Sequence, residues 1–180
     1  MVPATVPVRR LSVDDVFRMV EAGVLDEDDR VELVEGVLVE MVPIGPQHDG
    51  AVAWLTRHFA AAPGDAWEVR VQSTLLVSGG YLLPDLMLVE PPPRTEQPTS
   101  ALLVVETAQT SQVRDREKAR DYAAAGVPDY WIVDLEARAV EVHRRPLAGG
   151  YEEVTTFADG QSVSPLASDA PTVDVSALLG

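Results

Sequence analysis

Several residue types are missing or scarce in this chain, and each scarcity narrows what the protein can do. Cysteine is absent, which excludes disulfides, thiolate nucleophiles and cysteine-based zinc sites. The three histidines show no metal-ligand spacing such as H-x-x-x-H. Lysine occurs once, at Lys118, and arginine supplies the rest of the 14 Lys and Arg residues. A single lysine in a chain that otherwise uses arginine raises the question of whether that lysine has a chemical role.

Long apolar runs are also lacking. No stretch approaches the roughly 20 apolar residues of a membrane span, and the N-terminus lacks the charged start and apolar core of a signal peptide. We therefore expect a soluble, cytoplasmic protein with no membrane partner. The 180 residues predict a single domain, residues 1–180, that can bury a sizeable core without a disulfide or a metal.

Positive charge is scarce as well. The 14 Lys and Arg residues face 29 Asp and Glu residues, so the net charge is −15. This balance argues against a broad nucleic-acid-binding surface, because such binding rests on Lys and Arg displacing condensed counterions. A small local site remains compatible with it, particularly one in which a bound cation changes the local sign.

What the sequence does contain is a clear succession of helix and strand patterns. Helices are predicted at 12–23, with Ser12 as N-cap and Asp15 completing a capping box, at 49–61, and at 112–125 with Ser111 as cap. A hairpin over 30–42 turns at Gly36, and 43–48 reads as a loop. Further strands are predicted at 66–77, 84–90, 101–106, 129–136 and 139–145, and a tail hairpin at 151–165 with a "DG" turn. The core order is helix, three strands, helix, and one or two strands, which indicates a mixed α/β fold with a largely antiparallel first half.

Two of these strands, "PDLMLVE" and "ALLVVE", carry an acid at facing ends. If they pair as antiparallel neighbours in a symmetric register, Asp85 lies opposite Glu106, with Cβ atoms roughly 5 Å apart. Two carboxylates this close repel each other, so either one is protonated or a cation lies between them. Mg²⁺ is typically held by one or two carboxylates together with waters and phosphate oxygens. Such an ion can activate a water for attack on a phosphodiester.

The following helix can bring Lys118 to the same edge. Ser111, Asp115, Lys118 and Tyr122 are spaced by three and four residues and therefore share one helical face. An ammonium beside a metal-bound water can orient it, help to remove its proton, or neutralise developing charge; an arginine cannot lose its proton in this way. The alternative is a surface ion pair of Lys118 with Asp115 or Asp121. The basic cluster of Arg114, Arg116, Lys118 and Arg120 is likewise either a charged helix face or a contact to a phosphate backbone.

An ordered set of motifs over roughly residues 30–145 resembles the Uma-two family. The motifs are "RVELVEG", "PIGPQH", "VRVQ", "PDLMLVE", "VVETAQTS", "RDREK" and "YAAAGVPDYWIVD". That family is assigned to the PD-(D/E)XK, or restriction-endonuclease-like, superfamily. The resemblance implies an α/β (mixed α+β) fold, in which a central mixed β-sheet is flanked by helices and preceded by an N-terminal helix and β-hairpin. It also implies metal-dependent hydrolysis of phosphodiester bonds.

The resemblance assigns expected roles to individual residues. It makes Asp85 and Glu106 the metal-binding acids, with the backbone carbonyl of Thr107 as a further ligand to Mg²⁺ or Mn²⁺. The superfamily pattern places a lysine two residues after the second acid, where this chain has Ala108. Lys118 on the next helix looks like its migrated equivalent. Three further positions look characteristic of the family and are secondary catalytic candidates: Glu32, His48 and Gln72.

These observations leave three functions open. The first is a Mg²⁺- or Mn²⁺-dependent endonuclease acting on nucleic acid, with DNA as the expected substrate and a homodimer as the expected assembly. The second is a catalytically inactive domain of the same fold that acts as a dimerising or binding module, which the net charge of −15 and Ala108 favour. The third is a hydrolase of a small phosphodiester or nucleotide. Tyr122 is interpreted as a core residue in all three.

Overall fold

The structure, a computed structural model of the chain, describes residues 7–26, 28–41, 44–62, 65–109 and 112–180. The helices are α1 (Val13–Glu21), α2 (Pro46–Ala60), α3 (Gln112–Ala124) and α4 (Val175–Leu179). The strands are β1 (Val31–Val34), β2 (Val37–Glu40), β3 (Glu68–Val71), β4 (Leu75–Val77), β5 (Gly80–Leu82), β6 (Leu86–Val89), β7 (Leu103–Ala108), β8 (Asp129–Asp134), β9 (Ala139–Leu147), β10 (Gly150–Ala158), β11 (Ser162–Val163) and β12 (Val173–Asp174). None of the described helices combines the length and the apolarity that a membrane crossing requires.

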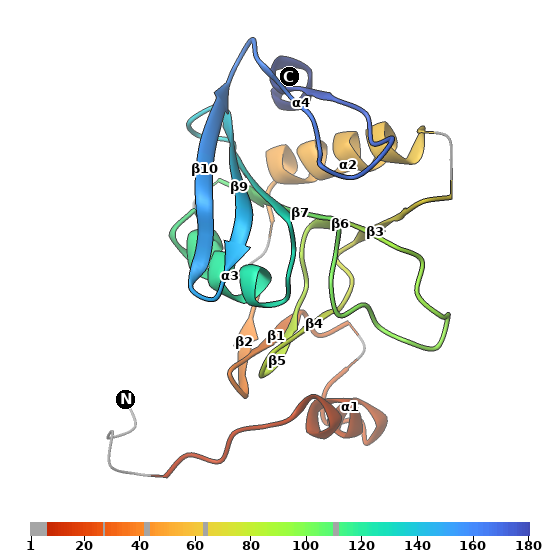
Figure 1. Ribbon diagram of the computed structural model, residues 1–180. Coiled ribbons are helices and arrows are strands. Elements are labelled where there is room, and N and C mark those ends of the chain that lie inside the picture. Colours follow the sequence, from red (N-terminus) through yellow and green to blue (C-terminus); the bar gives the residue numbers. More distant parts are fainter. Residues whose placement is uncertain (1–6, 27, 42–43, 63–64, 110–111) are drawn as a thin grey trace.

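A six-stranded mixed sheet, in the order β10-β9-β8-β7-β6-β3, forms the centre of the molecule. Strands β3, β6 and β7 are antiparallel neighbours, and α3 then carries the chain to β8, which runs parallel to β7. Helix α2 lies over one face of this sheet and α3 against the other (Figure 1). The order α2, three sheet strands, α3, strand is the one predicted from the sequence, so the mixed fold with an antiparallel first half is confirmed.

The alternation of side chains along β7 explains why Glu106 faces α3. Val105 is in the core cluster that includes Leu55 of α2, whereas Val104 is in the cluster that includes Tyr122 of α3. Successive side chains of a strand point to opposite faces. Glu106 is two residues after Val104, so it is directed to the α3 face.

A smaller four-stranded sheet, in the order β2-β1-β5-β4, lies below α3 in Figure 1, with α1 beneath it. The β1–β2 hairpin turns at Glu35 and Gly36, whose φ values of 48° and 76° are those of a two-residue primed turn. Ser12 and Asp15 form the predicted capping box at the start of α1. This sheet matters for function because β1 carries Glu32 towards the central sheet.

Three predictions of local structure are wrong, two in the bounds of an element and one in the pairing of strands. Helix α2 begins at Pro46 rather than Asp49, because proline is accommodated in the first helical turn, and this places His48 in the helix instead of a loop. The strand predicted at 66–77 is interrupted at Gln72, whose φ of 47° is left-handed. The tail is not a hairpin, since β10 pairs with β9 and the chain beyond the "DG" turn pairs with β12 instead. The cap assigned to Ser111 lies outside the described residues.

The contact between β5 and β1 allows a sharp prediction at Gly80. A Cβ at this position would lie 1.6 Å from the carbonyl oxygen of Leu33, a backbone atom that cannot give way without separating the two strands. We expect Gly80→Ala to lower the free energy of unfolding by about 3 kcal/mol. Gly50→Ala is the matched control, because nothing lies within 4 Å of its added Cβ, and alanine in a helix should stabilise by about 0.5–1 kcal/mol. Urea unfolding of both variants measures the two free energies of unfolding. Equal stability of the two variants would contradict the prediction that β5 and β1 cannot accommodate a side chain at Gly80.

Candidate active site

The two acids meet at the end of the β6–β7 pair. Leu86 is the register partner of Val105 and Leu88 that of Leu103, which is the register predicted from the sequence. The backbone N–H of Asp85 donates to Oε2 of Glu106 at 3.3 Å, and the N–H of Thr107 donates to Oδ2 of Asp85 at 2.8 Å. Both carboxyls are buried, with 5% of Asp85 and 3% of Glu106 exposed. The strand pairing therefore holds two buried acids side by side where the β6–β7 pair ends.

Helix α3 directs Lys118 to Glu106, one of these two acids, and to Glu32. Its Nζ donates to Oε1 of Glu106 and to Oε1 of Glu32, each at 2.9 Å. Only 8% of Lys118 is exposed, so the interpretation as a surface ion pair is wrong. An arginine could not replace this contact, because its planar guanidinium cannot place one compact charge between two buried carboxylates.

Glu32 joins the small sheet to this cluster. The residue is fully buried, and its Oε1 also accepts from the backbone N–H of Leu83 at 3.1 Å. Its Oε2 accepts from Nη2 of Arg114 at 2.8 Å, a contact that the sequence did not indicate, although Arg114 is one turn before Lys118 on α3. Tyr122 is buried in the core as expected, and in addition its hydroxyl donates to Oε1 of Glu106 at 2.6 Å. Arg114 and Tyr122 are thus the two members of the site that the sequence reading missed.

His48 is brought to the site by the first turn of α2. Its Nε2 lies 2.9 Å from Oδ2 of Asp85, whereas its Nδ1 is buried and has no hydrogen-bond partner among the described residues. Gln72 is different. Its backbone N–H donates to the carbonyl oxygens of Pro84 and Asp85, at 3.1 and 3.3 Å, but its side chain makes no hydrogen bond with the acids among the described residues. The structure therefore gathers five of the six candidate side chains, and Gln72 contributes only backbone support.

The electrostatics of the cluster follow from its burial. Burial raises the pKa of Glu106 to about 7, the ammonium of Lys118 opposes this rise, and the charge of Asp85 adds to it. Burial lowers the pKa of Lys118, but the attraction of Glu106 and Glu32 outweighs it, so the pKa ends above its ordinary value. Burial raises the pKa of Tyr122 well above its ordinary value, and Glu106 adds to the effect. Lys118 is therefore a fixed ammonium at neutral pH, suited to stabilising negative charge and unsuited to removing a proton.

The available donor atoms suit a hard cation with water ligands. Oδ1 of Asp85 accepts no hydrogen bond from the residues that the structure describes, and Oγ1 of Thr107 is buried without a partner in the same part of the chain. No group of three or more His, Asp or Glu side chains arranged to hold a metal occurs in the described ranges. A site of two carboxylates and a carbonyl suits Mg²⁺ or Mn²⁺, which keep several waters, better than Zn²⁺.

Comparison with known proteins identifies the family and a solved structure of similar fold. A family model described as "Uma2: Putative restriction endonuclease" matches residues 13–173. One similar solved structure is that of a "putative nuclease belonging to DUF820" from Anabaena variabilis, with a TM-score of 0.77 and 14% identity, covering 96% of this chain and 98% of that one. This likeness confirms the mixed α+β fold. A search of curated proteins gave no match.

Proposed function

Because this chain belongs to the Uma2 family, we propose that it is a metal-dependent endonuclease that hydrolyses phosphodiester bonds of nucleic acid, with DNA as the expected substrate. The observation that carries the proposal is the contact of Lys118 with the acids, since its Nζ lies 2.9 Å from Oε1 of Glu106, whose Oε2 accepts from the backbone of Asp85. A buried ammonium beside these carboxylates is a fixed charge of the kind that stabilises negative charge developing in a transition state.

In this proposal Asp85, Glu106 and the carbonyl of Thr107 hold Mg²⁺ or Mn²⁺. When bound, the ion supplies a Lewis acid and an activated water. Lys118 stays protonated and would stabilise the negative charge that develops on the phosphate. Glu32 and Tyr122 fix the positions of Lys118 and Glu106, and His48 holds Oδ2 of Asp85, which leaves Oδ1 as the oxygen that would be available to an ion.

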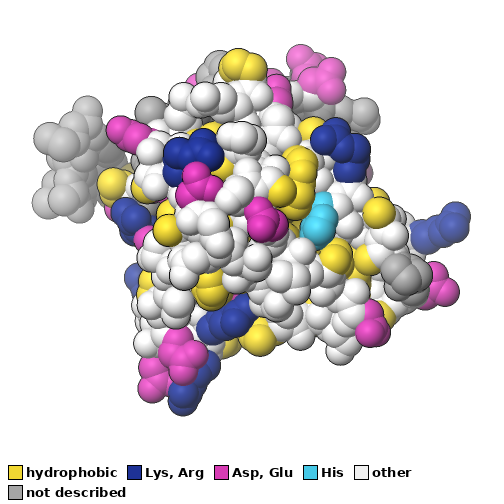
Figure 2. Space-filling view, turned by 90° about the horizontal axis from the view of Figure 1, so that it is seen from above, with side chains coloured by type: hydrophobic (Ala, Val, Ile, Leu, Met, Phe, Trp, Pro, Cys, Tyr) yellow, Lys and Arg dark blue, Asp and Glu magenta, His cyan; other side chains and the backbone are white. Residues whose placement is uncertain are grey.

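The alternative is a domain of the same fold that binds a partner without catalysis. The net charge of −15 favours it, because this charge opposes an extended contact with nucleic acid. Figure 2 shows basic and acidic side chains scattered over the face seen from above, with no gathering of basic ones there. Any contact with nucleic acid on that face would therefore have to be local. The single domain, the cytoplasmic location and the homodimer stay predictions.

Calorimetric titration with Mn²⁺ separates the two functions. We expect the unmodified chain to bind Mn²⁺ and Asp85→Ala to bind it at least about 100-fold more weakly, because a direct ligand contributes no less than the outer-shell groups around it. Asp65→Ala is the matched control, since Asp65 is an exposed acid outside the cluster and its loss should leave Mn²⁺ binding unchanged. A wild-type chain that takes up no Mn²⁺ would sink the enzymatic proposal and favour the binding module.

A further inference from the structure

A pocket of about 530 Å³ lies between α1 and the central part of the chain, and nothing described so far uses it. Its lining includes Phe17 of α1, Asp28 before β1, the segment 72–74 between β3 and β4, and Leu83 after β5. We call this the α1 pocket. Its size is within the usual range for small-molecule sites.

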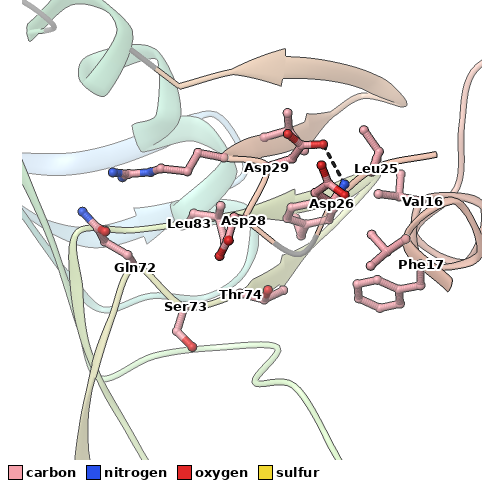
Figure 3. A pocket seen from close by; sticks show the side chains of 14 residues that line it. Val16, Phe17, Leu25, Asp26, Asp28, Asp29, Gln72, Ser73, Thr74 and Leu83 are labelled. Carbon is pink, nitrogen blue, oxygen red and sulfur yellow. Dashed lines mark hydrogen bonds between the residues drawn. The ribbon is translucent and has the colours of Figure 1, made fainter. Parts of the chain in front are cut away.

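The α1 pocket has an apolar wall and a polar wall that face each other. Figure 3 shows Val16 and Phe17 of α1 on one side and Gln72 and Ser73 on the other, with Asp28 between them. Phe17 is 41% exposed, and its ring centroid lies 6.4 Å from that of Tyr81, with an angle of 17° between the ring planes. The apolar wall therefore offers a partly exposed aromatic side chain that stacks on a second ring.

The polar wall contains side chains whose hydrogen-bonding groups have no partner among the described residues. The side chains of Asp28, Gln72, Ser73 and Thr74 make no hydrogen bond with any other residue in the described ranges. They contribute a carboxylate, an amide and two hydroxyls to the pocket lining, which also includes Asp26, Asp29 and Arg30. Such a mixture suits a flat ligand with an apolar face and a polar edge, and the carboxylate of Asp28 rejects an anionic group.

Two residues that line the α1 pocket also form backbone hydrogen bonds next to the acids of the candidate active site. Leu83 lines the pocket, and its N–H donates to Oε1 of Glu32. Gln72 also lines it, and its N–H donates to the carbonyls of Pro84 and Asp85. Two residues of extended chain span about 7 Å, which is the scale of one nucleotide. A phosphate near Asp85 would thus place a neighbouring base within reach of the pocket.

We infer that the α1 pocket binds one unstacked base of the nucleic-acid strand whose phosphate reaches Asp85 and Glu106. The base stacks on Phe17 and directs its edge to Asp28, so bases with an exocyclic amino group are preferred over thymine, whose edge carbonyls face a carboxylate. Recognition of a base outside the helical stack also explains how a chain of net charge −15 can bind nucleic acid without a basic surface. The inference rests on the proposed function for the position of the phosphate.

The test is the binding of fluorescent trinucleotides that differ only in their middle base, measured by anisotropy on the full chain with Ca²⁺ in place of Mn²⁺, so that a cation is present beside the acids, and with the trinucleotides checked to be intact after the measurement. We expect adenine, cytosine or guanine to bind roughly 10-fold more tightly than thymine. Phe17→Leu should weaken binding of every base by about 5- to 10-fold, because the stacking face is lost. Asp28→Asn should reduce the preference over thymine to less than about 3-fold, since an amide can also donate to a carbonyl.

The controls are Val154→Ala and Asp65→Asn, exposed positions away from the pocket, which should bind like the unmodified chain. An abasic trinucleotide that binds as tightly as the others would overturn the inference, as would unchanged binding by both Phe17→Leu and Asp28→Asn. Hydrolysis with Mn²⁺ is measured in parallel. Cleavage without base-dependent binding removes the base site and leaves the nuclease, whereas base-dependent binding without cleavage removes the nuclease and leaves the base site.

Discussion

Replacing Lys118 with methionine is expected to reduce Mn²⁺-dependent cleavage by about 10²- to 10³-fold, mostly in kcat, because the ammonium stabilises charge that develops only in the transition state. The side chain touches Glu106 and Glu32 at 2.9 Å and is held in a buried site, so water cannot replace its charge. Plasmid nicking under single-turnover conditions measures the chemical step directly. Binding of Mn²⁺ should persist, since methionine removes a competitor for Glu106 and no ligand.

The single substitution also has a structural effect that must be separated from catalysis. It leaves Glu32 and Glu106 buried without their shared cation, which costs about 3–5 kcal/mol when one partner of a buried ion pair is removed. The double variant Glu32→Gln with Lys118→Met removes one charge of each sign and should recover part of that stability while staying inactive. A folded double variant that cleaves like the unmodified chain would take Lys118 out of the mechanism.

Much of the central site could be predicted because its geometry is set by local rules. The β6–β7 register follows from two short apolar strands joined by a proline-rich loop, and this register brings Asp85 next to Glu106. The buried face of α3 follows from the spacing of Asp115, Lys118 and Tyr122, all of which are buried. Strand pairing and helix period alone thus indicate most of the cluster.

The remaining contacts depend on tertiary structure that no local pattern specifies. Glu32 is 86 positions from Lys118 and belongs to a different sheet, so its contact depends on how the two sheets are placed. The family resemblance pointed to Glu32, but only the packing shows that Arg114 binds its second oxygen. The error in the tail has the same origin. The "DG" turn forms, since the N–H of Gln161 donates to the carbonyl of Ala158 at 3.0 Å, but β10 pairs with β9 and β11 with β12, which are partners that a local turn does not specify.

A second buried acid, Asp129, shows how the fold uses charge outside the active site. Its Oδ1 accepts from Nε1 of Trp131 and Nε of Arg144, both at 2.8–2.9 Å. Its Oδ2 accepts from Nη2 of Arg144 at 3.2 Å and from the backbone N–H of Leu166 at 2.8 Å. The residue is fully buried at the start of β8. One carboxylate therefore joins β8, β9 and the segment that leads to the C-terminus.

We expect Asp129→Ala to lower the free energy of unfolding by about 3–5 kcal/mol, because it leaves Nε1 of the buried Trp131 without an acceptor and removes the carboxylate that pairs with the partly buried Arg144. Asp159→Ala is the matched control, since Asp159 also pairs with an arginine, Arg138 at 3.1 Å, but its side chain is 48% exposed. An exposed pair contributes at most about 1 kcal/mol. Urea unfolding with an unchanged m-value checks both, and equal shifts in the midpoint would show that Asp129 acts as an ordinary surface ion pair. The contrast matters for the active site. Burial lets Asp129 join three segments of the fold, but burial of the acids around Lys118 costs folding free energy, which is expected only where those acids serve a function.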